Sequence, residues 1–148
     1  MICEPITLLQ CCPNTDGSAA VILCSMDFAR KHTTNPVKIA GSALLSAGYS
    51  WQQKDITSSP LGVETARRAY EMAGCGPEDI DLVELHDAFS TEEILRYEDL
   101  GLCKPGEGVA FLRSGAPALG GKVPVNPSGG LLSLGHPLSA SGVRVVAE

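Results

Sequence analysis

The sequence has little positive charge and no long apolar run. Of its 148 residues, 11 are Lys or Arg and 17 are Asp or Glu, which gives a net charge of −6. Nucleic-acid phosphates are bound by clustered basic side chains, so this composition predicts no nucleic-acid partner. A membrane-spanning helix needs about 20 consecutive apolar residues, and no such run occurs, so no membrane span is predicted. The N-terminus also lacks a basic segment followed by an apolar core, so we expect an intracellular protein without a secretory signal.

Several motifs of known chemistry are also missing. The Cys and His residues show no paired spacing of the kind that binds zinc, and no Gly-x-Ser-x-Gly motif occurs. Residues 115–123 resemble a phosphate-binding loop, but Lys122 comes one residue late and Val123 replaces the expected Ser or Thr. The six cysteines have no regular spacing, which indicates reduced thiols rather than a disulfide framework. We therefore predict no bound metal ion.

The apolar pattern alternates between short strand-like runs and segments with helical spacing. Short apolar runs that follow turn-forming residues are typical of buried strands. Strands that alternate with helices predict an α/β domain with a largely parallel sheet. The predicted strands are 19–23, 37–47, 81–86 and 123–125, and the predicted helices are 25–31, 60–73, 90–100 and 137–148.

Capping residues mark the predicted helix boundaries. Ser59 precedes a proline, which is typical of a helix start, and Gly74 is typical of a helix end. Ser90 and Glu93 fit a capping box, in which each side chain binds the backbone N–H of the other residue. Pro137 is expected at the first position of the last helix. That helix is small or apolar on every side, as in a helix buried between layers.

Two histidines stand where a side chain can take part in chemistry. His136 lies at the start of the last predicted helix, where the helix dipole disfavours a positive ring. A neutral imidazole can accept the proton of a thiol. His86 lies at the carboxyl end of a predicted strand, where ligands of parallel sheets bind, and it can donate a hydrogen bond to an oxyanion. From position alone, His136 fits a plain helix cap better than a base, and His86 fits a polar strand end equally well.

Two longer segments carry a resemblance to a known family. Residues 85–90 (LHDAFS) and 126–142 (NPSGGLLSLGHPLSASG) resemble two signature segments of the thiolase superfamily. Most thiolases have Asn-Glu-Ala-Phe in the first segment. His86-Asp87 in its place resembles sterol carrier protein X-type thiolases and related lipid-transfer-like proteins. Residues 10–20 also resemble that group, in which this stretch closes the N-terminal half.

The resemblance implies a thiolase-like fold, C-terminal half, with a mixed sheet and helices layered on both faces. It implies an acyltransferase of lipid or sterol side-chain breakdown that cleaves 3-oxoacyl groups or runs the reverse condensation. The coenzyme A thioester is the substrate, and no further cofactor is implied. His136 would activate the acyl-accepting cysteine and help to bind the thioester oxygen, and His86 would support an oxyanion hole. Ala88 and Phe89 would line the acyl pocket.

The chain departs from the family pattern in its cysteines. The family nucleophile lies in the earlier half, a Cys-x-Gly segment follows the last helix, and the six cysteines here match neither position. We therefore expect residues 1–36 to be a remnant of the thiolase N-terminal domain. Residues 37–148 are expected to be a truncated C-terminal domain, incomplete at its C-terminus, and the isolated chain to be inactive.

Two other functions stay open at this point. One is a thiolase-like aldolase subunit of steroid side-chain degradation that needs a small coenzyme A-binding subunit. The other is a non-catalytic short form that binds a partner or a lipid. For the full-length enzyme the resemblance implies an acyl-coenzyme A substrate and a homodimer. Its compartment would be the peroxisome in a eukaryote and the cytoplasm in a bacterium.

Overall fold

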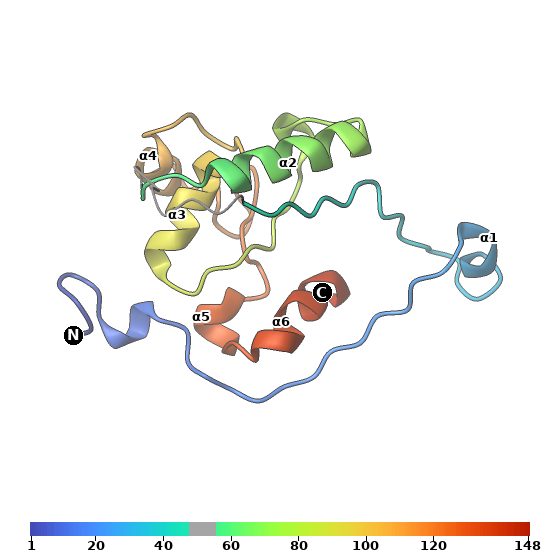
Figure 1. Ribbon diagram of the computed structural model, residues 1–148, viewed down its shortest axis with the longest axis horizontal. Helices are drawn as coiled ribbons and strands as arrows, with labels where there is room; N and C mark the ends of the chain where they lie inside the picture. Colours follow the sequence, from blue (N-terminus) through green and yellow to red (C-terminus); the bar gives the residue numbers. More distant parts are fainter. Residues whose placement is uncertain (48–55) are drawn as a thin grey trace.

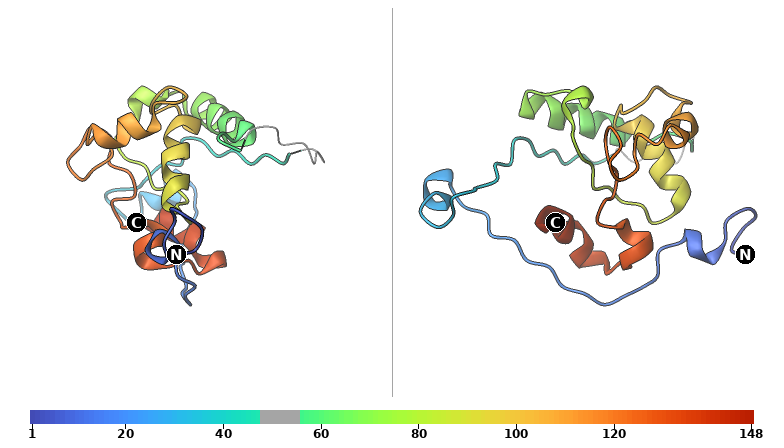
Figure 2. Two further views of the ribbon diagram at one scale, coloured as in Figure 1. Left: turned by 90° about the vertical axis from the view of Figure 1, so that its left-hand side faces the viewer. Right: turned by 180° about the vertical axis from the view of Figure 1, so that it is seen from behind.

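The structure is a computed structural model that describes residues 1–47 and 56–148 (Figure 1). Its helices are, in chain order, the 3₁₀ helix η1 (Leu8–Gln10), α1 (Met26–Ala29), α2 (Pro60–Ala73), the 3₁₀ helix η2 (Pro77–Asp79), α3 (Ser90–Asp99), α4 (Gly108–Arg113), α5 (Gly130–Leu134) and α6 (Leu138–Ala147). Helix α3 packs against both α2 and α4, and α5 and α6 lie to one side of this group. Residues 12–47, which we call the N-terminal arm, curve around the outside of the molecule (Figures 1 and 2).

The start and the end of α2 follow the predicted capping residues. Ser59 is the N-cap, and its hydroxyl accepts a hydrogen bond from the Gly62 N–H at 3.0 Å. Pro60 takes the first helical position, where a backbone N–H would have no partner within the helix. Gly74 ends the helix with a φ of 71°, in the left-handed region that a residue without Cβ enters freely. Local sequence therefore decides the limits of this helix.

The capping box predicted for α3 is wrong. Phe89 is the N-cap, and Ser90 is the first helical residue. The Glu93 carboxylate does not turn back to the start of the helix. It accepts hydrogen bonds from the Tyr97 hydroxyl and from Asn126 Nδ2, the latter at 3.3 Å. A bond from the next turn of α3 and a tertiary bond from Asn126 thus use the carboxylate that the capping box would have used.

Helix α6 begins one residue later than predicted, with Pro137 as its N-cap. Ser141 is its one buried residue, whereas Leu138 and Val146 are largely exposed. Within residues 1–47 and 56–148, the prediction of a helix buried between layers is therefore wrong, because no described segment covers its outer side.

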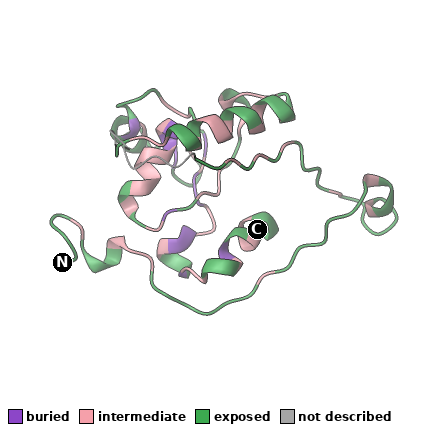
Figure 3. Ribbon diagram, in the orientation of Figure 1, coloured by how far each residue is buried: buried purple, intermediate pink, exposed green. Residues whose placement is uncertain are grey.

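The core is small and is centred on α3. Tyr97 is fully buried, and its ring meets Phe111 of α4 edge-on, with ring centroids 5.1 Å apart. Among the described residues, Val123, Val125 and Leu131 are the other buried apolar side chains. Figure 3 shows that buried stretches are few and that most of the ribbon is exposed or intermediate. This core fixes α3 beside the segments that carry the two candidate histidines.

The mixed sheet with helices on both faces is not confirmed. In the described part of the chain, β pairing is limited to three isolated bridges, Cys3 with Ile6, Cys11 with Phe89 and Val83 with Val125. The last bridge is parallel and joins two of the predicted strands. The other two, 19–23 and 37–47, form no ladder with any described segment. An extended segment becomes part of a sheet only when a neighbour takes its N–H and C=O groups.

The N-terminal arm exposes large apolar side chains. Ile22, Val37 and Leu44 are each at least 90% exposed. A hollow of about 850 Å³ lies between the arm and the end of α6, and Ile39 and Val146 are among its lining residues. Apolar surface of this extent is typical of a face that takes part in an interaction.

Candidate active site

His86 is positioned by the pairing of its own segment with residues 123–126. The Val83 N–H donates to a carbonyl of that segment at 3.0 Å, and the Asn126 N–H donates to the Val83 carbonyl at 2.7 Å. The Asn126 side chain extends the pairing, since its Oδ1 accepts from the Leu85 N–H at 2.8 Å. The backbone just before His86 is therefore fixed by hydrogen bonds to residues 123–126.

His136 is positioned by a tight turn between α5 and α6 that packs on the N-terminal arm. Gly135 has a φ of 86°, and a Cβ at this position would lie 2.4 Å from Thr15 Cγ2. Only glycine fits this close approach. The His136 N–H donates to the Pro13 carbonyl at 3.0 Å. The arm therefore fixes the backbone from which the His136 ring projects.

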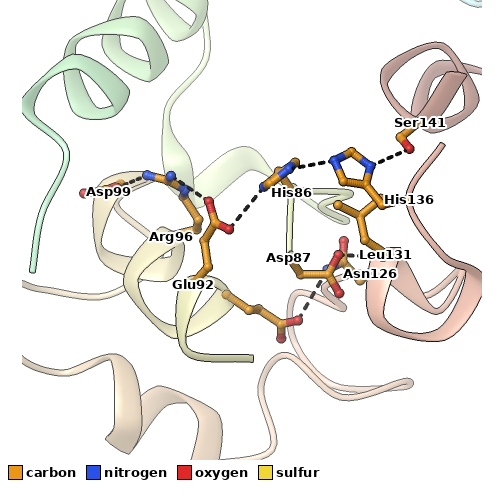
Figure 4. Close-up of polar contacts among 10 residues, drawn as sticks. His86, Asp87, Glu92, Arg96, Asp99, Asn126, Leu131, His136 and Ser141 are labelled. Carbon is orange, nitrogen blue, oxygen red and sulfur yellow. Dashed lines mark hydrogen bonds and ion pairs between the residues drawn. The ribbon is translucent and has the colours of Figure 1, made fainter. Parts of the chain in front are cut away.

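The two rings meet although 50 residues separate them in the chain. The Nε2 atoms of His86 and His136 lie 3.3 Å apart, and the rings are nearly perpendicular, with an angle of 76° (Figure 4). A hydrogen bond between two imidazole nitrogens needs one proton, so one ring donates and the other accepts. The His86 side chain is 53% exposed and His136 is half-buried. Neither ring is fully buried.

Each ring is also held through its other nitrogen. His136 Nδ1 lies 2.8 Å from Ser141 Oγ of α6, and Ser141 Oγ donates to the Pro137 carbonyl at 3.0 Å. His86 Nδ1 lies 3.1 Å from Glu92 Oε2 of α3. The contact between the rings thus joins α3 to α6.

Glu92 begins a row of charged side chains on α3. Its Oε1 accepts from Arg96 Nη2 at 2.9 Å, and Arg96 Nη1 donates to Asp99 Oδ2 at 2.7 Å. The Asp99 side chain is 4% exposed, and its Oδ1 accepts from the Ser59 N–H at 3.1 Å. Burial alone would lower the pKa of Arg96, but the two carboxylates outweigh burial and raise it. The row therefore stays charged and runs from the interior to His86.

Asp87 points into the protein, away from the rings (Figure 4). It is 2% exposed, and its Oδ1 accepts from the Leu131 N–H of α5 at 2.6 Å. Burial raises the pKa of Asp87, whereas hydrogen bonds from the backbone of Leu131 and Leu132 act to lower it. Asp87 thus ties the end of the His86 segment to the start of α5, the helix that precedes His136.

Ala88 and Phe89 lie where the His86 segment joins α3. The Ala88 carbonyl accepts from the Cys12 N–H at 2.9 Å, and Phe89 forms an antiparallel bridge with Cys11. Phe89 is 44% exposed. Cys11 and Cys12, where the N-terminal arm begins, therefore lie directly beside these two residues, and no sequence pattern indicated this contact.

All six cysteines are free. Among residues 1–47 and 56–148, no group of three or more His, Cys, Asp or Glu side chains is arranged to hold a metal ion. The same described ranges contain no helix with the length and hydropathy needed to cross a bilayer.

Sequence reasoning identified both histidines but missed Glu92 and Ser141. Ser141 follows His136 by five residues and lies in the first turns of α6, close enough in the chain to have been considered as its partner. Glu92 follows His86 by six residues, and its place on α3 depends on where that helix starts. The capping-box prediction assigned the hydrogen bonds in the first turn of α3 to Ser90 and Glu93. For this reason the contact of Glu92 with His86 was not predicted.

Comparisons with known proteins identify the relatives of this chain. The family described as thiolase C-terminal domain-like matches residues 42–148. An acetyl-CoA acetyltransferase of Methanothermobacter thermautotrophicus is 47% identical over 149 residues, covering 100% of this chain and 39% of that protein. Sterol carrier protein 2 of Rattus norvegicus is 44% identical over 149 residues, covering 97% of this chain and 27% of that protein.

A solved structure is similar over the same length. A chain of the Ltp2-ChsH2(DUF35) aldolase is 29% identical, with a TM-score of 0.85 over 100% of this chain and 39% of that one. The chain thus spans about two fifths or less of the length of these relatives. The predicted thiolase-like fold and the resemblance to sterol carrier protein-type thiolases are both confirmed, and the chain belongs to the thiolase C-terminal domain-like family.

Proposed function

We propose that this chain supplies the C-terminal half of a thiolase-type acyltransferase site that acts on coenzyme A thioesters. The observation that carries the proposal is the 3.3 Å approach of the His86 and His136 Nε2 atoms from two separate segments. Both rings are anchored through Nδ1, and the His86 side chain is 53% exposed. Side chains held in this way suit proton transfer and oxyanion binding, because the reactive atom is oriented before the substrate arrives.

His136 acts as the base that takes the proton of a cysteine thiol. Ser141 engages its Nδ1, which leaves Nε2 as the reactive atom. Its position before α6 favours the neutral ring, because the N-terminus of a helix carries partial positive charge. His86 donates a hydrogen bond through Nε2 to the thioester oxygen, on which negative charge develops during acyl transfer. A substrate oxygen that lies near both Nε2 atoms replaces the contact between the rings.

Ala88 and Phe89 line the acyl pocket in this proposal. They follow His86 by two and three residues, and the partly exposed Phe89 ring offers apolar surface beside the site. An apolar wall next to a polar centre is the usual build of a site that binds an acyl chain.

The acyl-accepting cysteine comes from a thiolase N-terminal region rather than from the six thiols described above. In this proposal residues 1–36 belong to that N-terminal domain and residues 37–148 to the C-terminal domain. Segments 19–23 and 37–47 become strands of a mixed sheet, with helices on both faces, when that region is present. The bare apolar surface of the N-terminal arm and the greater length of the relatives support this arrangement.

The setting of the complete enzyme follows from the same proposal. It is a homodimer that takes acyl-coenzyme A in lipid or sterol metabolism. It works in the peroxisome of a eukaryote or the cytoplasm of a bacterium. Likeness to sterol carrier protein 2 supports the link to lipid metabolism and transport.

A second candidate function is that of an aldolase subunit. The 0.85 TM-score with a chain of the Ltp2-ChsH2(DUF35) aldolase favours it, because the name of that aldolase joins two components. Such a subunit would need a small coenzyme A-binding partner, and the exposed apolar arm offers a surface for one. The same surface also suits a non-catalytic short form that binds a partner or a lipid.

A domain graft tests the leading proposal. This chain replaces the matching 149 aligned residues of the acetyl-CoA acetyltransferase, which keeps its own N-terminal region. We expect the graft to form a 3-oxoacyl-coenzyme A from acetyl-coenzyme A and to lose this activity on His136→Ala. His32→Ala, a change in the third histidine of the chain, is the matched control and should leave the rate unchanged. Activity that survives His136→Ala would refute the proposal, and cleavage of a 3-hydroxyacyl-coenzyme A without acetyl transfer would favour the aldolase.

A further inference from the structure

The hydrogen bonds around His136 assign the position of its ring proton. Ser141 has a single hydroxyl proton, which it donates to the Pro137 carbonyl at 3.0 Å. Toward His136 the Ser141 oxygen is therefore an acceptor, so His136 Nδ1 carries a proton across the 2.8 Å contact. In a neutral His136 ring the Nε2 atom then has a lone pair, and this lone pair faces His86.

Glu92 imposes the same arrangement on His86. An ionised carboxylate can only accept, so His86 Nδ1 donates to Glu92 Oε2 over 3.1 Å. If His86 were also neutral, its Nε2 would carry a lone pair as well. Two lone pairs would then face each other at 3.3 Å, which is repulsive. One additional proton between the rings turns this contact into a hydrogen bond.

The charges that face the two rings decide which of them holds the additional proton. His86 faces the carboxylate of Glu92 on α3 and interacts electrostatically with Asp87, its neighbour in the chain. The positive charge of Arg96, on the same helix as Glu92, is already shared between two carboxylates. His136 faces an uncharged hydroxyl and the N-terminus of α6, where a cation is disfavoured. When the pair holds the additional proton, these neighbours favour His86 over His136 as the cationic ring.

We propose that Glu92 is a positioning residue that makes His86 the cationic hydrogen-bond donor of the pair and keeps His136 the neutral acceptor. Glu92 does not contact the reacting atoms. It acts through His86, and the buried end of its charged row holds it in place. The catalytic meaning of this assignment rests on the proposed function, because an oxyanion needs a donor and a thiol needs a base. The protonation states themselves do not depend on any reaction.

Nitrogen NMR of the whole chain, labelled in histidine, tests the assignment without any assay of activity. Long-range proton–nitrogen correlations distinguish a ring with both nitrogens protonated from each neutral tautomer. In the state in which the pair holds the additional proton, we expect His86 to be doubly protonated and His136 to be the Nδ1–H tautomer. A His136 ring protonated on Nε2, or a neutral His86, overturns the proposal. The unmodified chain gives this result, so the test does not depend on a variant that folds.

Glu92→Gln isolates the charge, because glutamine keeps the length of the side chain and an oxygen acceptor. At the same pH the ratio of protonated to neutral His86 should fall roughly two- to fivefold, the scale of losing a close opposite charge at a partly exposed site. The His32 ring and the amide spectrum should be unchanged. Glu71→Gln, which removes an exposed charge from α2, is the matched control and should leave His86 as it was. A His86 ratio that does not respond to Glu92→Gln would show that the carboxylate has only a structural role.

The graft separates this inference from the proposed function. Glu92→Gln in the graft should shift the pH profile of kcat and leave KM little changed, since the substrate does not touch Glu92. An inactive graft together with the expected NMR result would refute the proposed function and leave the proton assignment standing. An active graft with a neutral His86 would refute the assignment alone.

Discussion

Helix α5, which precedes His136, begins with a glycine whose replacement has a calculable cost. Gly130 has a φ of 61°, and a Cβ at this position would lie 2.2 Å from Asp87 Oδ2. Asp87 cannot easily move aside, because it is 2% exposed and accepts the Leu131 N–H at 2.6 Å. Gly130→Ala should cost about 1–2 kcal/mol for the left-handed backbone and a further ~1–3 kcal/mol for overpacking. A loss of this size is a large share of the roughly 5–15 kcal/mol that holds a typical domain together.

Gly120→Ala is the matched control, since it has the same backbone strain without the overlap. Gly120 has a φ of 80°, and a Cβ there would meet nothing within 4 Å. Only the backbone cost of about 1–2 kcal/mol is expected for it. Urea unfolding followed by circular dichroism measures both free energies of unfolding, and similar slopes would show that the unfolded states are comparable. Equal losses for the two variants would refute the close contact between Gly130 and Asp87.

The remaining predictions concern the site and the helices. In the graft, His136→Ala should abolish acetyl transfer, whereas His86→Ala should lower kcat by about 10²–10³-fold, as when one oxyanion-hole donor is lost; steady-state kinetics that show equal effects would contradict the separate roles. Burial raises the pKa of Asp87 above its ordinary 3.8. Its contribution to stability is therefore fully present below that pH and is lost as the pH rises through the raised value. Asp87→Asn should therefore make the free energy of unfolding depend less on pH in this range. Urea unfolding at several pH values measures this dependence, and a pH dependence equal to that of the unmodified chain would contradict the prediction. Ser59→Ala removes the N-cap bond to α2 and should lower the free energy of unfolding by about 1 kcal/mol, measured by thermal melting; an unchanged melting temperature would show that the cap is dispensable.

Features that depend on neighbouring residues could be predicted from the sequence. The limits of α2 follow from Ser59 and Gly74, because a cap and a left-handed glycine act within one helical turn. The two segments that carry His86 and His136 were also identified, since their residue types are specific and contiguous. Neither prediction required knowledge of which segments lie side by side.

Features that depend on distant partners could not be predicted. Glu93 was expected to cap α3, but its carboxylate binds Asn126, which lies 33 residues away in the chain, as well as the Tyr97 hydroxyl of the same helix. Segments 19–23 and 37–47 have the apolar pattern of strands, but a pattern cannot supply the partner that a ladder needs. The motif alone grouped Asp87 with His86. In the structure the Asp87 carboxylate faces α5 instead and accepts the Leu131 N–H.

The geometry of the two rings depends on three stretches of chain that are far apart in the sequence. His136 takes its backbone position from Pro13 in the N-terminal arm, and His86 takes its position from residues 123–126. Beyond its first residues the arm buries few apolar side chains, so little free energy holds it against the rest of the described chain. A polypeptide that binds the exposed arm in its present position would favour the arm's contact with the rest of the chain. It would thereby also favour the hydrogen bond between Pro13 and the His136 backbone. Because a ligand shifts an equilibrium only by its differential affinity for the two states, such a partner would order the active site without touching either histidine.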